Sequence, residues 1–238
     1  MLRIGTSGFQ YPEWKGTFYP RDLSTAKLLP FYAERFSTTE INYSFYRIPA
    51  PKSLANWDAA TPARFRFSFK APKEITHVRR LRDAGETLRQ ILAATQNLGG
   101  KLGPILFQLP PFFKKDVALL ADFCASLPAR LKCAFEFRHA SWFDDETFGI
   151  LKDRRAALCV AESEKLATPV VVTADHAYFR LRREDYTAAD LKRWAKIISG
   201  QTPVKDAYVY FKHEECGVGP KFAKQFEQLL GSSRPAAS

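Results

Sequence analysis

The chain has 238 residues, a length that suits one α/β barrel, and 46% of them are hydrophobic, including 20 phenylalanines, which is enough for a large core. The formal net charge of +11 favours acidic or phosphorylated partners, although a basic surface also serves solubility alone. No apolar stretch approaches the roughly 20 residues of a membrane span, and no signal-peptide pattern precedes the first strand, so we expect a cytoplasmic protein that contacts no membrane.

At least six short runs alternate large apolar residues with polar ones, as two-faced strands do, because successive side chains of a strand point to opposite faces. Eight segments are strand candidates in all, at 2–7, 38–45, 65–71, 104–109, 133–139, 156–162, 177–182 and 207–212. Helical periodicity fills most of the gaps, at about 24–36, 82–97, 116–126, 144–154, 187–199 and 220–230, with a shorter turn over 51–60. Between Glu162 and Ala177 there is little room for a helix, so helix six should be missing or vestigial.

Alternating strands and helices predict parallel strands with right-handed crossovers, and eight such units close into a TIM-type (β/α)8 barrel of the α/β class. Residues 1–231 should form this single domain, because no linker or repeat divides the chain. Residues 232–238 lack an apolar anchor and should be a disordered C-terminal tail. The four cysteines form no CxxC pair and are interpreted as reduced thiols.

In such a barrel the polar face of each strand should point to the interior or the mouth, because a charge buried against the helices would be costly. The residues that this alternation places there are Glu40, Asn42, Lys70, Gln108, Glu136, Arg138, Arg180, Arg182 and Lys212. Two acids therefore stand against five bases, a balance that suits a phosphate or carboxylate ligand. The alternative is an internal salt-bridge network that only holds the barrel together.

Four residues are candidates for catalysis. Glu40 and Glu136 are the candidate acid and base, and they would form a glycosidase pair only if their side chains converge. Lys70, desolvated beside Arg138, should have a lowered pKa and act as a base, as an amine nucleophile or, as we prefer, as an electrostatic group. His77, in a loop after the third strand, is interpreted as a proton donor or an anion ligand.

Loop residues should add ligand contacts. The first loop places Thr6 and Ser7 between glycines, where backbone N–H groups can meet an anion. Aromatic residues at loop positions would stack on a sugar or nucleobase, or else fill the barrel top as packing. The complete set of expected ligand contacts is Thr6, Ser7, Tyr11, Trp14, Asn42, Tyr46, Gln108, Arg138, His139, Trp142, Arg180 and Lys212.

No HxH or HExxH spacing occurs, and we predict no cofactor and no metal. The less favoured alternative is a divalent metal held by His139 or His213 with Glu40 and Glu136. It is less favoured because several strand ends that would supply carboxylates carry Lys or Arg instead.

Five groups of residues together resemble the YecE-like family, domain of unknown function family 72. They are Ile4–Gly8 with Tyr11 and Trp14, Glu40–Asn42 with Tyr46, Phe69–Pro72 with His77, Leu102–Pro111, and Phe135–His139 with Trp142. The resemblance covers nearly the whole chain and implies a TIM-type barrel, but it brings no established reaction. Architectural likeness to endonuclease-IV-like and sugar-isomerase-like barrels suggests DNA or sugar phosphates as ligands, by fold analogy alone.

After the seventh and eighth strands the sequence departs from the family pattern. Arg180-Leu-Arg-Arg183 stands where the family commonly shows Arg-x-His-Gly, and Phe211-Lys-His213 stands where it shows Phe-Asn-Asn. The changes at Arg182, Arg183 and Lys212 add positive charge to the mouth.

Together these features predict a monomeric or homodimeric protein that acts by acid–base chemistry, as a hydrolase or lyase, on a phosphorylated or carboxylated small molecule. One alternative is a nucleic-acid binding or DNA-repair-like barrel, with mouth aromatics around a flipped or single-stranded base. Another is a barrel that only binds a metabolite, as the departures late in the chain suggest.

Overall fold

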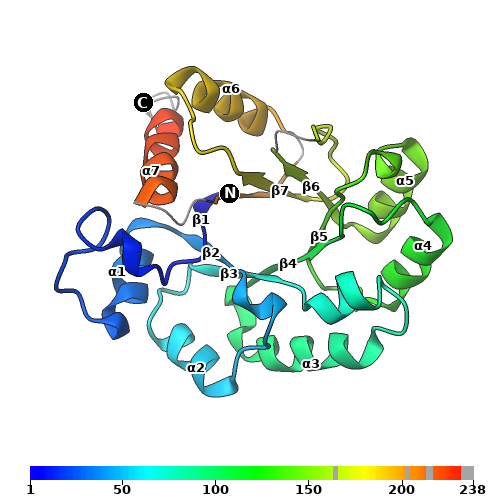
Figure 1. Ribbon diagram of the computed structural model, residues 1–238, viewed down its shortest axis with the longest axis horizontal. Coiled ribbons are helices and arrows are strands. Elements are labelled where there is room, and N and C mark those ends of the chain that lie inside the picture. Colours follow the sequence, from blue (N-terminus) through cyan, green and yellow to red (C-terminus); the bar gives the residue numbers. More distant parts are fainter. Residues whose placement is uncertain (163–165, 202–203, 213–216, 232–238) are drawn as a thin grey trace.

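The computed structural model describes residues 1–162, 166–201, 204–212 and 217–231. Eight parallel strands close into a barrel in chain order, and helices surround them (Figure 1). The strands are β1 Leu2–Ser7, β2 Thr38–Ile41, β3 Arg66–Lys70, β4 Leu102–Gln108, β5 Cys133–Glu136, β6 Ala157–Ala161, β7 His176–Leu181 and β8 Asp206–Phe211. The predicted TIM-type barrel is therefore confirmed.

The helices are α1 Leu28–Arg35, α2 Pro51–Ala59, α3 Gly85–Thr95, α4 Val117–Ser126, α5 Asp145–Arg154, α6 Ala188–Ser199 and α7 Val218–Gly231. The segment predicted as a short turn is the nine-residue helix α2, which begins with a proline in its first turn and buries Leu54 and Trp57. Between β6 and β7 the described residues contain no helix, as predicted. Thr173 instead ties the extended segment to β6, accepting from the backbone of Leu158 at 2.8 Å.

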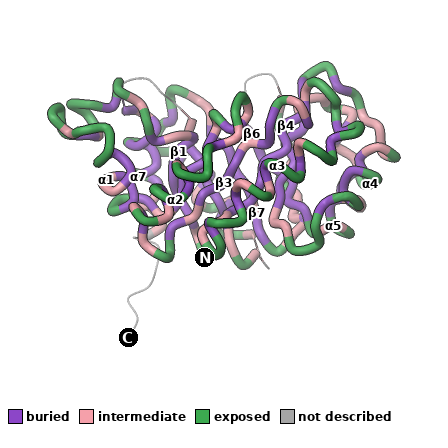
Figure 2. Tube along the Cα trace, turned by 90° about the horizontal axis from the view of Figure 1, so that it is seen from below, coloured by how far each residue is buried: buried purple, intermediate pink, exposed green. Residues whose placement is uncertain are grey.

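The inner and outer faces of the strands contribute to separate hydrophobic clusters. Phenylalanines on the outer face pack on the helices: Trp57 of α2 stacks on Phe67 at 5.7 Å, and Phe123 of α4 meets Phe107 at 5.1 Å. The inner face carries a second cluster of Leu106, Ala134, Ala157, Cys159, Ala161, Tyr178, Tyr208 and Tyr210. Viewed from the side, the strands are buried and exposed residues gather in the loops at both ends of the barrel (Figure 2).

Two strands, β2 and β5, end well before the residue that the alternation predicts, and the other strands end within one residue of the prediction. β2 ends at Ile41, and Tyr43–Phe45 form a short 3-10 helix that Ser44 ties to β3 through a hydrogen bond to the Lys70 carbonyl at 2.6 Å. β5 ends at Glu136, so Arg138 and His139 lie in the following loop. Strand alternation does not set the direction of side chains beyond these ends.

The loop between β3 and α3 has an unusual backbone. It contains a π-helical turn, Glu74–Val78, and three non-glycine residues with positive φ, namely Arg80 at 49°, Leu81 at 73° and Asp83 at 47°. Such conformations are costly for these residue types and tend to occur at functional sites.

The sequence also gives predictions for the four cysteines and for the C-terminal tail. Cys124, Cys133 and Cys159 are free thiols buried in the core, whereas Cys216, His213 and the predicted tail 232–238 lie outside the described residues. Within the described ranges, no helix combines the length and the apolar character needed to cross a bilayer.

Candidate functional site

One buried guanidinium holds two carboxylates together at the centre of the barrel. Arg180 of β7 donates from Nη2 to Oε1 of Glu40 at 2.9 Å and from Nη1 to Oε2 of Glu136 at 2.6 Å. None of the three side chains is more than 2% exposed. Because Arg180 bridges Glu40 on β2 and Glu136 on β5, and all three side chains are buried, the two carboxylates are occupied by one guanidinium rather than open to a sugar as a glycosidase pair requires.

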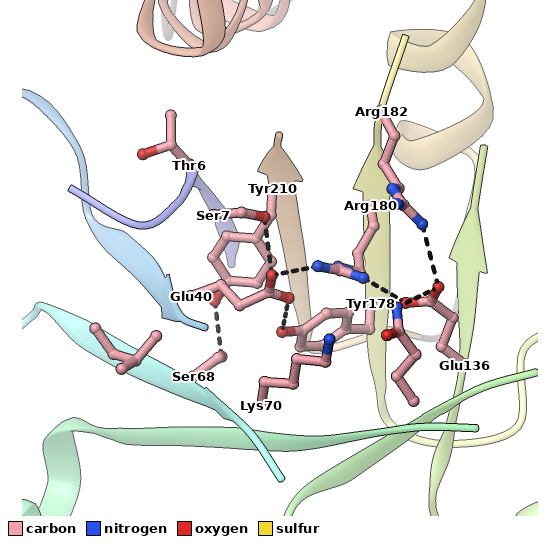
Figure 3. Close-up of polar contacts among 12 residues, drawn as sticks. Thr6, Ser7, Glu40, Ser68, Lys70, Glu136, Tyr178, Arg180, Arg182 and Tyr210 are labelled. Carbon is pink, nitrogen blue, oxygen red and sulfur yellow. Dashed lines mark hydrogen bonds and ion pairs between the residues drawn. The ribbon is translucent and has the colours of Figure 1, made fainter. Parts of the chain in front are cut away.

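Glu40 is satisfied on both oxygens. Its Oε1 accepts a hydrogen bond from Ser7 Oγ at 2.8 Å as well as from Arg180, and its Oε2 accepts from the Tyr178 hydroxyl at 2.6 Å. Figure 3 shows these donors converging on Glu40 from β1 and β7. Ser7, expected to contact a ligand, therefore serves Glu40.

Glu136 is paired in the same way. Gln108 Nε2 donates to its Oε1 at 2.8 Å, and Arg182 Nη1 lies 3.6 Å from that oxygen (Figure 3). Burial opposes ionisation of Glu136, but Arg180, Arg182 and the hydrogen bonds outweigh it and lower the pKa of this carboxyl. A carboxylate whose oxygens are occupied by donors is a poor general base, so Glu40 and Glu136 form a structural network with Arg180.

Lys70 lies beside this network without joining it. Its ammonium makes no hydrogen bond or ion pair with a described residue, and its Nζ lies 4.0 Å from the centroid of the Phe45 ring. Burial, followed by the positive charge of Arg180, lowers the pKa of Lys70 from 10.5 to about 8, while Glu136 and Glu40 offset part of the effect. Arg180, rather than the expected Arg138, is thus the main charge that acts on Lys70.

His77 packs against the same Phe45 ring. The two ring centroids are 4.9 Å apart with planes at 85°, and His77 Nδ1 lies 2.9 Å from Thr76 Oγ1. Partial burial and the positive charges of Lys70 and Arg138 lower the pKa of His77. The imidazole is therefore neutral at neutral pH, and it is better suited to accept a proton than to donate one as expected.

A cavity of about 640 Å³ opens at the mouth, beside the ends of β5, β6 and β7. Arg138 lines it and makes no hydrogen bond or ion pair with a described residue. Arg182 lines it too, and among the described residues its only ion pair is the long one to Glu136. Arg183, by contrast, is paired with Asp185 at 3.1 Å. Two arginines with unused donors therefore face one cavity.

The first loop is packed against the protein. Thr6 is 1% exposed and faces α1, where its backbone N–H donates to the Tyr32 hydroxyl at 2.8 Å. Tyr11 donates its hydroxyl to the Ser7 carbonyl at 2.7 Å and packs on Trp14, which is fully buried. The expectation that Thr6 and Trp14 contact a ligand is therefore wrong, because both are enclosed by protein.

Trp142 and His139 also have structural roles. Trp142 is fully buried, donates from Nε1 to the Phe113 carbonyl at 2.7 Å and stacks on Phe137 at 4.7 Å, so the expectation that it stacks on a ligand is wrong. His139 Nδ1 accepts from the Ser141 backbone N–H at 3.2 Å and caps the short helix over Ala140–Trp142.

The remaining expected contacts lie at the ends of β2 and β8. Tyr46 is 76% exposed on the loop after β2. Asn42 has a buried Oδ1 with no hydrogen-bond partner among the described residues and lines a small cavity of about 170 Å³ together with Tyr11 and Tyr43. Lys212 follows β8, and its charge also acts to lower the pKa of Lys70.

The part of the chain that the structure describes contains no cluster of three His, Cys, Asp or Glu side chains that would hold a metal ion. His139 is engaged with Ser141, and Glu40 and Glu136 with Arg180. These residues therefore do not fit the alternative metal site. His213, the other histidine named for that site, lies outside the described residues.

Sequence reasoning missed the tyrosines of this interior. Tyr178 donates to Glu40, and the Tyr210 hydroxyl donates to Ser68 Oγ at 2.7 Å. Tyr178 lies two positions before Arg180 and shares its face, so strand alternation could have identified it. Phe45, which contacts both Lys70 and His77, lies in a loop and gave no such signal.

Comparisons with known proteins agree with this architecture. A DUF72 family protein from Thermotoga maritima has a solved structure that matches with a TM-score of 0.87 at 29% identity, covering 97% of this chain and 99% of that one. UPF0759 protein YunF of Bacillus subtilis is 26% identical over 97% of this chain and 95% of its own length. UPF0759 protein YecE of Escherichia coli is 29% identical over 60% of this chain and 50% of its own length. An L-ribulose 3-epimerase, with a TM-score of 0.54 at 12% identity, shares the fold alone. The family described as protein of unknown function DUF72 matches residues 3–238, and the chain belongs to that family, as its motifs predicted.

Proposed function

We propose that the mouth of the barrel binds a small molecule through one phosphate or carboxylate group and acts on it by acid–base chemistry. The observation that carries this proposal is the pair Arg138 and Arg182, which line the cavity of about 640 Å³ with donors that the described residues leave largely unused. A half-buried guanidinium without a partner has lost hydration, and a bound anion would replace the lost hydrogen bonds.

The attraction for an anion is local, because the cavity lining holds as many acidic as basic side chains. Glu136 is already neutralised by Arg180, and Asp185 by Arg183. The remaining charged lining residues are Glu184 and the two arginines Arg138 and Arg182, which leave one positive charge in surplus. This balance suits a ligand with one anionic group rather than a polyanion.

Lys70 and His77 are the groups suited to proton transfer. With its pKa lowered to about 8, Lys70 carries a useful fraction of neutral amine near neutral pH, and the neutral imidazole of His77 accepts a proton. Glu40 and Glu136 instead hold Arg180 in position. A base beside a bound anion is what a lyase or a hydrolase of this kind needs.

Calorimetry with inorganic phosphate, sugar phosphates and small carboxylates tests the anion site. Arg138→Gln should weaken binding by about tenfold or more, because a charge-assisted contact contributes about 1.5–3 kcal/mol. Its melting temperature should not change, because Arg138 has no partner among the described residues. Arg89→Gln on α3 is the matched control, since Arg89 pairs with Glu86 on the outer surface and its loss changes the net charge equally.

Equal affinities for all three proteins, or no binding of any anion in the panel, would contradict the proposal. Anion binding that Arg138→Gln weakens, with no turnover of any bound compound, would support the alternative of a barrel that only binds a metabolite.

A second candidate function, binding of single-stranded nucleic acid, is favoured by the exposed rim of the mouth. Tyr46 is 76% and Phe112 66% exposed, and each ring has a cation near it, Lys73 at 6.0 Å and Arg80 at 5.9 Å. Exposed aromatic rings with basic neighbours stack unpaired bases while the cations contact phosphates. Oligonucleotide affinity that falls steeply with salt and is lost in Tyr46→Ala would support this function, and no retention at low salt would remove it.

A further inference from the structure

The surroundings of Lys70 raise the fraction of its side chain that is a neutral amine. Both carboxylates of the interior are engaged by other donors, Glu40 by Tyr178 and Arg180 and Glu136 by Gln108 and Arg180. Among the described residues, the Phe45 ring at 4.0 Å offers the ammonium a cation–π contact in place of an ion pair. Figure 3 shows the Lys70 side chain reaching from β3 toward this network with no interaction drawn to it. Lys70 is thus a desolvated lysine whose neighbouring acids are already satisfied.

We propose that Lys70 is a covalent catalytic residue, whose amine condenses with the carbonyl group of an aldehyde or ketone that also carries a phosphate or carboxylate. This inference rests on the proposed function for the anionic part of the ligand and adds the part that reacts. Nζ attacks the carbonyl carbon, and the carbonyl oxygen takes up the two protons that Nζ loses and leaves as one water molecule. The resulting C=N bond, once protonated, withdraws electrons from the adjacent carbon, which favours lyase over hydrolase chemistry.

This site makes the proton of Lys70 easier to lose, although most Lys70 side chains still carry the charge at neutral pH. Burial and Arg180 lower the pKa of Lys70 from 10.5 to about 8. The ratio of neutral amine to ammonium is therefore about 300-fold higher at neutral pH than for an ordinary lysine. Because Lys70 is the last residue of a barrel strand, its backbone is also held firmly for attack.

The neighbouring groups supply the other functions that such chemistry needs. Lys70 does not itself line the cavity, but its charge interacts with that of Glu136, which does. Arg138 lines the same cavity and acts electrostatically on His77, which shares the Phe45 ring with Lys70. The proposal places the anionic group of the ligand at Arg138 and its carbonyl group toward Lys70, with His77 available to accept a proton.

Reductive trapping on the full chain tests the proposal. Pyridoxal 5′-phosphate, which combines an aldehyde with a phosphate, is added at limiting concentration near neutral pH, reduced with borohydride and located by peptide mapping. We expect the label on Lys70, at a rate that rises with pH and levels off above the pKa of about 8. Inorganic phosphate should slow the labelling by competing for the anion site.

Lys115 provides an internal comparison in the same digest. It is also partly buried, but it is ion-paired with Glu146 at 3.1 Å and with Asp144, and these hydrogen bonds raise its pKa. A lysine held in the charged form should remain unlabelled under the same conditions. Lys115→Arg should leave labelling of Lys70 unchanged.

Lys70→Arg separates the covalent step from anion binding, because arginine keeps the charge and cannot form the imine. We expect loss of trapping with phosphate affinity retained within about twofold. Labelling spread over exposed lysines, equal in the wild type and Lys70→Arg, would overturn the proposal. Phosphate binding without trapping at Lys70 would reject the imine and leave the anion site standing, whereas trapping that phosphate cannot slow would support the amine and reject the anion site.

Discussion

Among single residues, Lys70 links the chemistry of the site to the stability of the fold. Its pKa is about 8 in the folded protein and returns to 10.5 when the chain unfolds. The unfolded chain binds this proton more tightly, so the cost to folding is complete below about pH 8 and disappears as pH rises toward 10.5. The cost is about 3 kcal/mol at neutral pH. The charged groups that act on Lys70 are Arg180, Glu136, Glu40 and Lys212.

Lys70→Met keeps most of the side-chain volume and removes the charge. Its free energy of unfolding should exceed that of the wild type by up to about 3 kcal/mol at neutral pH, and the difference should shrink as pH rises above the lowered pKa. Urea unfolding of both proteins at neutral and alkaline pH measures this difference. Lys73→Met, at an exposed position of the next loop, is the control and should show no pH-dependent change. A difference that is constant with pH would mean that the Lys70 pKa is not lowered.

The residues that meet at the centre of the barrel could be predicted from the sequence, but their pairing could not. Alternation along strands placed Glu40, Glu136 and Arg180 on the inner face, because side chains two positions apart share a face. That one guanidinium bridges both acids depends on strand register and on rotamers, which a sequence pattern does not contain. The surplus of bases over acids likewise gave no sign that the unused donors would be those of Arg138 and Arg182.

At the scale of elements, α5 ends in a left-handed residue that is not glycine. Arg155 has φ 55° and ψ 38°, and its backbone N–H donates to the carbonyl oxygens of Leu151 and Lys152. Glycine usually occupies this position, because a Cβ costs about 1 kcal/mol there. The Arg155 side chain is exposed, so little packing compensates for that cost.

Arg155→Gly should raise the free energy of unfolding by about 0.5–1 kcal/mol. The gain is limited because glycine also adds conformational freedom to the unfolded chain. Chemical denaturation measures the change, and Arg155→Ala, which keeps the Cβ, should give no gain. A less stable glycine variant would show that the arginine side chain contributes more than its backbone conformation costs.

Helices and strands could be predicted where the hydrophobic periodicity continues over several residues. The errors lie at the ends of these elements. The strand predicted over 133–139 stops at Glu136, and beyond that point alternation no longer directs side chains. The expectation for Trp142 failed because it rested on a loop position, which does not set the direction of a side chain, whereas Gln108 and Arg180, which lie inside strands, point to the interior. Helix α2 was underestimated because it buries only Leu54 and Trp57, too few residues to establish a period.

For the whole molecule, the decisive feature is that Arg180 connects strands that are not neighbours in the barrel. Glu40 lies on β2, Glu136 on β5 and Arg180 on β7, and no two of these strands are adjacent in the closed order. Taking three charges out of water is costly, and only good geometry with additional hydrogen bonds offsets that cost. The interior network therefore holds the barrel closed only while its charges remain matched.

Arg180→Met removes the central charge and keeps an apolar side chain of similar length. The two buried carboxylates are left without their shared partner, and we expect a loss of about 3–5 kcal/mol in the free energy of unfolding at neutral pH, measured with urea. Adding Glu40→Gln and Glu136→Gln to the same chain removes the stranded charges and should restore much of that loss.

The pH dependence of the free energy of unfolding distinguishes two causes of instability in Arg180→Met, unpaired buried carboxylates and lost packing. In the wild type, the pKa of Glu136 lies below its usual 4.5, so stability is present above that value and falls as pH drops through the lowered pKa. In Arg180→Met, burial without a cation should raise the carboxyl pKa values, and protonation should stabilise the fold as pH falls from neutral toward the usual range. Opposite slopes of stability against pH in the two proteins are therefore expected. Parallel slopes would show that Arg180 contributes through packing rather than by neutralising Glu40 and Glu136.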